Sequence, residues 1–272
     1  MPSAQEGPAP EFDLRIDSGG RMVGSFPGLD AIDCIVHAVT TRYGPSFPAN
    51  VDTPAIDVAA GELTEALGLR GAAWATQVHG DGVLHVTTAG LAGQADGLIT
   101  STPGLGVLGR SADCPLVLLA GRTDVGDSET DASHVVGMAH ASWRSTVKGI
   151  TTKVVLQMQQ IWQIDPSGIT ATICPSAGPC CYEVGQEVRD IAITSLGAAA
   201  NQFFKVRDGR LYFDLWAANV AQLSSSGVPA DQIHISAVCT ICRNDLFPSF
   251  RWEGKAACRF AGVIGITTTT QL

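Results

Sequence analysis

The stretch "GLGVLGRSADCPLVLLA", Gly104 to Ala120, decides the fold class because it holds two apolar runs separated by only a short polar break. Similar runs lie nearby in "AWATQVH", "GVLHVTT" and "HVVGMAH", with little helical sequence among them. Short apolar runs of this kind are typical of buried strands. Because the strand-like runs cluster and do not alternate strictly with helices, the sequence predicts an α+β fold with mixed β-sheets, in preference to a doubly wound fold.

A long amphipathic helix follows the last of these runs, because seven apolar residues recur at the three-and-four spacing of one helix face. They are Val147, Ile150, Val154, Val155, Met158, Ile161 and Trp162. Further helices are expected over 57–69, 183–196 and 215–225, the last with Asp214 as its N-cap. Additional strands are expected in "CIVHAVT", "GITATIC", "QIHISAV" and "RFAGVIGI".

The composition limits the class of protein. The chain has 272 residues and a net charge of -9, which argues against a nucleic-acid partner because phosphate neutralisation needs a basic surface. It contains no apolar run near the roughly 20 residues that span a bilayer, and its first residues do not look like a secretory signal. We therefore expect a cytoplasmic protein with no membrane partner. We also expect a flexible tail over 1–20, a single domain over 21–272 and an acidic surface loop over 121–133.

The eight cysteines are expected to be reduced, because a chain of this length can build a core without disulfides and nothing indicates export. Most are expected to be small buried residues. The adjacent pair Cys180 and Cys181 and the "CTIC" pair Cys239 and Cys242 stand apart from the others. A single CxxC without a second one is only a weak indication of a metal ion.

Three metal-competent residues each lie at an end of an apolar run. His79 closes "AWATQVH", Cys114 precedes "PLVLLA" and His140 closes "HVVGMAH". Two imidazoles and one thiolate suit zinc, and three protein ligands leave a fourth position open. Taken alone, the grouping is one of many possible trios, since a histidine after an apolar run is more often a hydrogen-bonded structural residue.

Four ordered segments of the sequence resemble those of the YfiH/laccase-domain family. They are "TQVHGDGV", "SADCPLVLL", "AHASWR" and "GPCCYEVGQEV", and the similarity extends over roughly 34–266. That family has been described as multicopper polyphenol oxidases and later as zinc-dependent purine nucleoside phosphorylases. The resemblance implies a layered α/β/β/α sandwich with mixed sheets. It also implies that His79, Cys114 and His140 are metal ligands and catalytic residues.

The resemblance also bears on the substrate. Arg42 and Arg144 match arginines of the family, and we expect them to bind phosphate, Arg144 near the N-terminus of the long helix where an anion is favoured. Glu183 is a weaker candidate, and it is equally explained as a first-turn carboxylate of a helix. Asp113 and Asp214 are the other acid/base candidates, although Asp214 is better explained as a cap. Where the family has Gly-Trp-Arg-Gly, this chain has Ser142 to Ser145, "SWRS".

The implied function is the zinc-dependent phosphorolysis of adenosine, inosine or guanosine to a free base and ribose 1-phosphate, with adenosine deamination as an additional activity. The alternative is a copper-binding, laccase-like polyphenol oxidase. Six histidines without a His-x-His pair cannot build a multicopper centre, but a site of two histidines and one cysteine can take up copper. A metal-free cysteine hydrolase using Cys114 and a purely structural metal ion are two further readings. The sequence leaves the choice between monomer and homodimer open.

Overall fold

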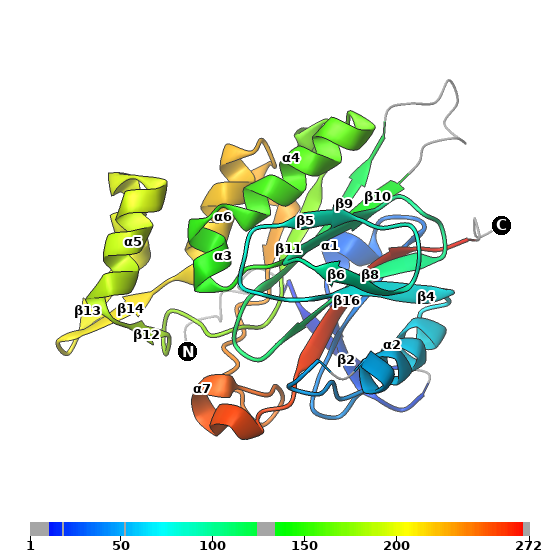
Figure 1. Cartoon of the computed structure of the whole chain (residues 1–272), viewed down its shortest axis with the longest axis horizontal. Helices are drawn as coiled ribbons and strands as arrows, with labels where there is room; N and C mark the ends of the chain where they lie inside the picture. Colours follow the sequence, from blue (N-terminus) through cyan, green and yellow to red (C-terminus); the bar gives the residue numbers. More distant parts are fainter. Residues whose placement is uncertain (1–10, 18, 52, 124–133, 269–272) are drawn as a thin grey trace, which may run out of the picture.

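Two large β-sheets packed face to face, with helices on both outer sides, form the body of the molecule (Figure 1). The computed structural model describes residues 11–17, 19–51, 53–123 and 134–268. None of the helices in these ranges is both long and apolar enough to cross a membrane. The predicted acidic loop over 121–133 lies almost wholly outside the described residues.

The first sheet has seven strands and is mixed, since β4 runs parallel to β6 and β8 while the other pairs are antiparallel. Its strands, in spatial order, are β1 (Asp13–Ile16), β2 (Met22–Ser25), β3 (Ile35–Thr40), β16 (Phe260–Ile266), β8 (Leu105–Ser111), β4 (Gly71–Thr76) and β6 (Gly90–Gln94).

The second sheet has six strands and is also mixed, with parallel pairs at both edges. Its strands, in spatial order, are β15 (Ile233–Ile235), β11 (Thr170–Ile173), β9 (Leu116–Arg122), β10 (His134–His140), β7 (Gly97–Thr100) and β5 (Val83–His85). A three-stranded sheet at one end of the molecule consists of β12 (Glu183–Val184), β14 (Arg210–Phe213) and β13 (Phe204–Arg207).

Three apolar layers hold the sandwich together. The innermost layer lies between the sheets, where Val107 and Ile264 of the first meet Leu118 and Met138 of the second. On the outer side of the first sheet, α2 (Thr53–Ala66) packs Ile56 and other residues against the strands. On the outer side of the second sheet, α4 (Ile150–Trp162) and α6 (Leu215–Ser225) complete the fourth layer. The predicted α/β/β/α sandwich with mixed sheets is confirmed.

The remaining helices are short or lie beside the three-stranded sheet, where α5 packs. They are α1 (Pro27–Asp30), α3 (Trp143–Val147), α5 (Gln186–Leu196) and α7 (Phe250–Glu253), with 3-10 turns η1 (Pro166–Gly168), η2 (Ala198–Phe203), η3 (Ala230–Gln232) and η4 (Gly254–Ala256). Asp214 caps α6 by accepting a hydrogen bond from the backbone N–H of Ala217, as predicted.

The predicted long helix after His140 is two helices. The five-residue α3 ends at Val147, and α4 begins at Ile150 after Gly149, whose φ of 77° lies in the left-handed region. A left-handed residue interrupts the helical hydrogen-bond ladder, and glycine adopts that conformation at little cost. The apolar spacing continues across the break although the two helices bury different clusters: Val147 packs near Ala192 and Ala200, whereas the apolar residues of α4 pack on the second sheet.

The predicted end of the N-terminal tail, at residue 20, is wrong, because part of this segment forms a strand. Asp13 to Ile16 form β1, which pairs antiparallel with β2, and Phe12 is buried against Phe26, with ring centroids 5.0 Å apart. Gly24 of β2 leaves the space for this ring, since a Cβ there would lie 2.1 Å from Phe12. One aromatic residue in a polar segment gives no periodic signal, which is why the sequence does not predict this strand.

Candidate metal centre

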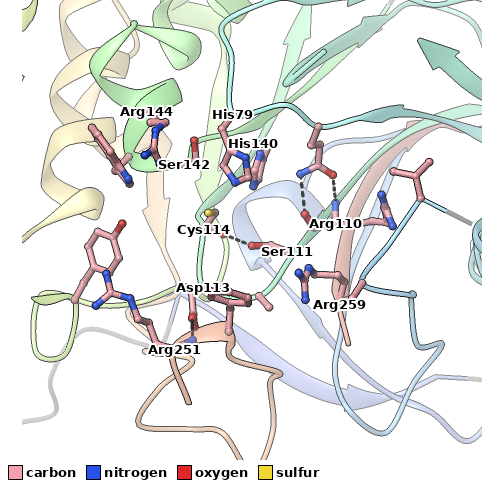
Figure 2. A pocket seen from close by; sticks show the side chains of 17 residues that line it. His79, Arg110, Ser111, Asp113, Cys114, His140, Ser142, Arg144, Arg251 and Arg259 are labelled. Carbon is pink, nitrogen blue, oxygen red and sulfur yellow. Dashed lines mark hydrogen bonds between the residues drawn. The ribbon is translucent and has the colours of Figure 1, made fainter. Parts of the chain in front are cut away.

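The connection between β8 and β9 crosses from the first sheet to the second, and Cys114 lies in this crossing. His140 is the last residue of β10 in the second sheet, whereas His79 lies in the loop after β4 of the first. The ligand atoms of His79, Cys114 and His140 all lie within 4.8 Å of one another. The fold therefore brings together three residues that are separated by 26 or more positions in the sequence; Figure 2 shows both imidazoles beside the sulfur.

His79 does not close its strand as the sequence suggests, because β4 ends three residues earlier at Thr76. The residue has a φ of 56°, and Asp113, next to Cys114, has a φ of 95°. Non-glycine residues in this region are strained, and such strain persists only where surrounding contacts hold it. Two of the three converging segments thus have a backbone conformation that the rest of the fold must stabilise.

Asp96 holds both histidine segments in place. Its buried carboxylate accepts a hydrogen bond from Nδ1–H of His140 at 2.8 Å. The same carboxylate accepts the backbone N–H groups of Val78, His79 and Gly80 at 3.1, 3.1 and 2.7 Å. A carboxylate bonded to Nδ1–H fixes the ring orientation and leaves Nε2 free to bind a metal.

The electrostatics favour an ionised cysteine. Burial by itself raises the pKa of the Cys114 thiol, but the neighbouring His140 and His79 outweigh it and lower the pKa to about 6. Burial lowers the pKa of His140, but the Cys114 sulfur and Asp96 reverse this and raise the pKa to about 9. Burial also raises the pKa of Asp96, yet its hydrogen bonds to His140 and to the 78–80 backbone lower it overall. The thiolate is the form of cysteine that binds metals.

The three residues open into a cavity of about 380 Å³. Four guanidinium groups also line it, those of Arg110, Arg144, Arg251 and Arg259. In Figure 2, Arg144 and Arg251 lie on one side of Cys114, and Arg110 and Arg259 lie on the other. Among the described residues, no carboxylate forms an ion pair with any of these four arginines. Such a cavity attracts anions, because the positive charges have no internal partner.

Arg110 is the most constrained of the four. Its guanidinium donates to the carbonyl oxygens of Pro48 and Asn50, and Nε has no hydrogen-bond partner within the described part of the chain. Burial, and then the like charge of Arg259, lower the pKa of Arg110 to about 10. Two cations held near each other with an unsatisfied donor are stabilised by a bound anion.

The opposite side of the cavity is partly aromatic. The guanidinium carbon of Arg144 lies 4.3 Å from the centre of the Trp143 ring, and that of Arg251 lies 4.9 Å from the centre of the Tyr182 ring. Phe250 also lines this cavity and is half exposed. Aromatic faces and stacked guanidinium groups are surfaces on which planar bases stack.

The other predicted site residues have different positions. Arg42 does not line the cavity; its guanidinium donates to the carbonyl oxygen of Asn244 and pairs with Glu253. The prediction that Glu183 lies in a helix is wrong. Glu183 lies in β12 opposite Tyr212, and its carboxylate lies 3.2 Å from Arg210. The helix α5 begins three residues later, at Gln186, after Gly185 in an extended conformation.

Asp113 is a structural residue of the cavity wall. One carboxylate oxygen accepts the hydroxyl of Thr240 and the other accepts the backbone N–H of Arg251, both at 2.7 Å. A helix does begin beside Arg144, as expected, but it is the separate five-residue α3 and not the start of the long helix. Within α3, the N–H of Ser145 is already satisfied by the Ser142 hydroxyl.

The sequence reading missed Asp96, Arg110, Arg251 and Arg259. Arg110 carried a signal, since an arginine inside the apolar run "GLGVLGRS" must be buried if the run is a strand. Arg251 carried one as well, since it lies in "SFRW", where the resembling family has a Tyr-Arg-Arg segment. Asp96 and Arg259 carried none. Only the packing of the strands brings them to the cavity.

Comparisons with known proteins agree with this architecture. The sequence profile of the family described as multi-copper polyphenol oxidoreductase laccase matches residues 50–267. A protein of Geobacillus stearothermophilus named purine nucleoside phosphorylase YlmD is 33% identical over 201 residues, which cover 70% of each chain. A Deinococcus radiodurans protein named purine nucleoside phosphorylase is 33% identical over 256 residues, 88% of this chain and 94% of that protein. The crystal structure of YlmD from Geobacillus stearothermophilus superposes with a TM-score of 0.75 at 28% identity, covering 93% of this chain and 98% of that one.

Proposed function

The chain belongs to the multi-copper polyphenol oxidoreductase laccase family, and from that membership we propose that it is a zinc-dependent purine nucleoside phosphorylase. Two relatives that are 33% identical carry the name purine nucleoside phosphorylase. The proposed reaction converts adenosine, inosine or guanosine and phosphate into the free base and ribose 1-phosphate. The observation that carries the proposal is one cavity with three metal-competent side chains and four arginines that form no ion pair with a carboxylate in the described part of the chain.

We propose that His79, Cys114 and His140 hold the zinc ion. The donor set fits, because two imidazoles and a thiolate are borderline to soft ligands and their ligand atoms lie within 4.8 Å of one another. The hydrogen bond between Asp96 and His140 is the kind of outer contact that metal-bound histidines have. When bound, the ion supplies a Lewis acid with an open position in the cavity.

The arginines are proposed to position the phosphate. In phosphorolysis a phosphate oxygen forms a bond to C1′ of the ribose while the C1′–N9 bond breaks, and its electron pair leaves with the base, which takes up a proton. Positive charge develops on the sugar as the base departs. A phosphate held beside that carbon by fixed guanidinium groups supplies both the nucleophile and the compensating negative charge.

Among the four arginines, Arg144 is the one that we assign the main role in phosphate binding. It lies on the segment directly after His140, so the strand that holds one metal ligand also fixes its distance from the ion. Arg110 and Arg259 face the same cavity from the other side and add to its positive potential. The aromatic rings of Trp143 and Tyr182 are proposed to contact the purine.

The test measures the base released from inosine, adenosine and guanosine as a function of phosphate concentration, together with the zinc content. Cys114→Ala is expected to lose the zinc ion and turnover together. Arg144→Ala is expected to keep the zinc ion but to need at least tenfold more phosphate, since a charge-assisted hydrogen bond contributes about 1.5–3 kcal/mol. Arg210→Ala, an exposed arginine outside the cavity, is the control. No base release by the zinc protein at any phosphate concentration would disprove the proposal.

Adenosine deamination is proposed as an additional activity of the same cavity. Its signature is distinct, because adenosine is converted to inosine without any phosphate. Chromatography of adenosine reactions with and without phosphate therefore separates the two activities in one experiment. Inosine formed without phosphate supports deamination, and adenine formed only with phosphate supports phosphorolysis alone.

Copper-dependent oxidation of phenols is the second candidate, favoured by the name of the family and by the donor set. Of the six histidines, all within the described residues, only His79 and His140 line the cavity. One copper ion is therefore the most that this cavity can take. If the zinc protein releases no purine base and the copper-loaded protein oxidises phenols, this second candidate replaces the first.

A further inference from the structure

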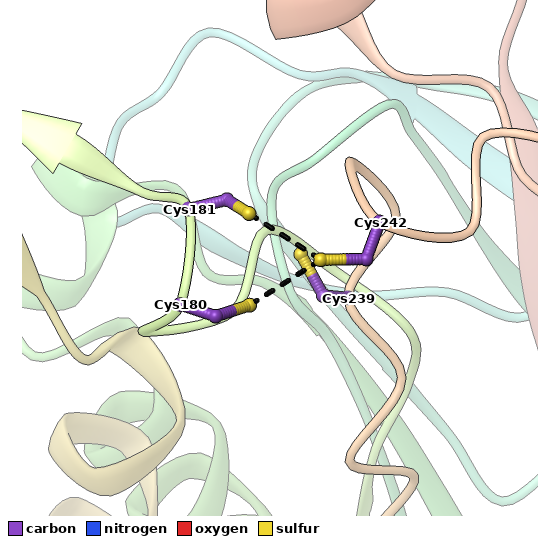
Figure 3. A group of neighbouring side chains, drawn as sticks. All are labelled: Cys180, Cys181, Cys239 and Cys242. Carbon is purple, nitrogen blue, oxygen red and sulfur yellow. Dashed lines mark hydrogen bonds between the residues drawn. The ribbon is translucent and has the colours of Figure 1, made fainter.

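A second group of metal-competent side chains lies outside the cavity. We propose that Cys180, Cys181, Cys239 and Cys242 bind a second metal ion, a zinc ion held by four thiolates. Their sulfur atoms all lie within 4.8 Å of one another. Figure 3 shows the four side chains converging from two separate loops, one after β11 and one after β15. None of the four residues lines the cavity of the first site.

The spacing of the sulfur atoms fits a tetrahedral ion. The Sγ atom of Cys242 lies 3.6 Å from that of Cys180 and 3.4 Å from that of Cys181. With zinc–sulfur bonds of about 2.3 Å, the edge of a regular tetrahedron of sulfurs is roughly 3.8 Å. Cys180 and Cys242 are exposed and Cys181 is half-buried, so small movements of these three side chains around the buried Cys239 are enough to reach this geometry.

The backbone around Cys239 is arranged to support a thiolate. The N–H of Gly178 donates to its Sγ atom at 3.3 Å. A backbone N–H that donates to a sulfur stabilises negative charge on it. This donor therefore favours the thiolate form that binds a metal ion.

The two loops are held together without the metal ion. Thr240 donates its backbone N–H to the carbonyl oxygen of Ser176, and Ser176 donates its own to Val238. Cys181 lies in a turn closed by its N–H to the carbonyl oxygen of Gly178. The ligands are therefore largely pre-positioned, so that little chain entropy is lost when the ion binds.

The net charge of a zinc ion with four thiolates is compatible with this surface. Each thiol releases its proton to solvent as it binds, so four thiolates around a zinc ion leave two negative charges. The N–H of Gly178, which donates to the Cys239 sulfur, offsets part of this charge. The guanidinium of Arg207 lies beside the cluster and donates to the carbonyl oxygens of Pro179 and Cys180 at 2.7 and 2.9 Å. A site closed by four protein ligands has a structural role, since no position is left for substrate.

The ion would brace one wall of the catalytic cavity. Tyr182, which lines that cavity, follows Cys181 directly. Thr240, which follows Cys239, donates its hydroxyl to Asp113 at 2.7 Å, and Ala177 donates its N–H to the Asp113 carbonyl oxygen at 2.8 Å. Asp113 precedes the ligand Cys114. The two loops joined by the four cysteines thus support the strained segment that carries the first site.

The experiment counts zinc ions per chain after purification of the full chain under anaerobic, reducing conditions without added copper. Wild type is expected to hold two, and the double variant Cys239→Ser/Cys242→Ser one. Cys114→Ala is expected to lose the other ion and to keep the one bound by the four cysteines. The control Cys34→Ala, a cysteine of neither group, is expected to hold two.

Cobalt replacement identifies the ligands in the variant that leaves the four cysteines intact. Cys114→Ala loaded with Co²⁺ is expected to show thiolate-to-cobalt charge transfer and the visible bands of tetrahedral all-sulfur coordination. Adding Cys239→Ser/Cys242→Ser to that variant is expected to abolish both. A Cys114→Ala protein without bound metal, or a disulfide among the four cysteines of the purified wild type, overturns the proposal. A wild-type protein with one ion that Cys114→Ala retains would overturn the first metal site and leave this one standing.

Discussion

Asp96 does not line the cavity, but its buried carboxylate positions two of the segments that do. Its carboxylate has four hydrogen-bond partners, three of them backbone N–H groups of one loop and the fourth the ring of His140. An acceptor-only group is required at this position, because every partner donates. Asn would turn one acceptor into a donor that faces these N–H groups.

Asp96→Asn is therefore expected to weaken zinc binding at the first site by about 10- to 100-fold, as is typical when a partner of a metal-bound histidine is removed. Titration of the metal-free protein with zinc, in competition with a chromophoric chelator, measures the dissociation constant. Asp190→Asn, an exposed carboxylate on α5, is the control and is expected to have no effect. Equal affinities for the two variants would mean that Asp96 does not orient the ligands.

His37 predicts a pH dependence of stability. This residue of β3 is buried, and its Nε2 accepts the backbone N–H of Phe26 at 2.8 Å. Burial lowers its pKa from 6.5 to about 4, although the nearby Asp30 acts in the opposite direction. Because the unfolded chain binds the proton more tightly, the free energy of unfolding is fully retained above about pH 6.5 and falls as the pH decreases toward 4.

The loss attributable to His37 is expected to reach up to about 3 kcal/mol, since one pKa unit corresponds to about 1.4 kcal/mol. Urea unfolding of wild type and His37→Gln at several pH values between 7 and 4 measures it. The glutamine oxygen can still accept the N–H of Phe26 but does not titrate, so the variant is expected to lose less stability over this range. Parallel pH profiles for the two proteins would exclude His37 as the cause.

At the scale of elements, β1 shows how one residue fixes a strand at the edge of a sheet. The four residues of β1 are all exposed, so the strand buries no side chain of its own. Phe12, directly before it, is buried beside Phe26 and Phe247. The anchored Phe12 ring therefore holds the residues that follow it, those of β1, beside β2. The pairing of this strand depends on a residue that lies outside it.

Phe12→Ala is expected to destabilise the protein by about 3 kcal/mol, at the lower end of the range for phenylalanine truncation in cores. Leu14→Ala in the middle of β1 removes an exposed side chain and is expected to change stability by no more than about 0.5 kcal/mol. Chemical denaturation gives both free energies of unfolding. A Phe12→Ala protein as stable as wild type would restore the prediction of a flexible tail up to residue 20.

At the scale of the whole molecule, each proposed metal ion joins segments that belong to different parts of the chain. His79 belongs to the loop after a strand of the first sheet, His140 to a strand of the second, and Cys114 to the crossing between them. An ion bound only by the folded state stabilises it by mass action. Removal of the ion at His79, Cys114 and His140 is therefore expected to weaken the contact between the two sheets.

A strong chelator is expected to lower the thermal midpoint of wild type. At free zinc a hundredfold above the dissociation constant, one site contributes about 2.7 kcal/mol, which corresponds to roughly 5–10 °C for a chain of this size. Differential scanning calorimetry with and without chelator measures the shift. In Cys114→Ala the shift is expected to be smaller but not zero, because the four cysteines still bind an ion. No shift in wild type would contradict metal binding at both sites.

From the sequence by itself, local patterns determined the cap of α6 and the clustering of strands, and the family resemblance indicated the layered fold and the three metal-competent residues. Apolar spacing reports which face of an element is buried, and four ordered motifs report the family. The site around the three residues required the tertiary structure. Arg110, Arg251 and Arg259 lie in segments far apart in the sequence and meet at one cavity, which Asp96 supports from behind its wall. The four cysteines meet because the loops after β11 and β15 lie side by side at the end of one sheet. Contacts between such distant segments leave no periodic trace in the chain, so packing alone decides which charges and sulfurs become neighbours.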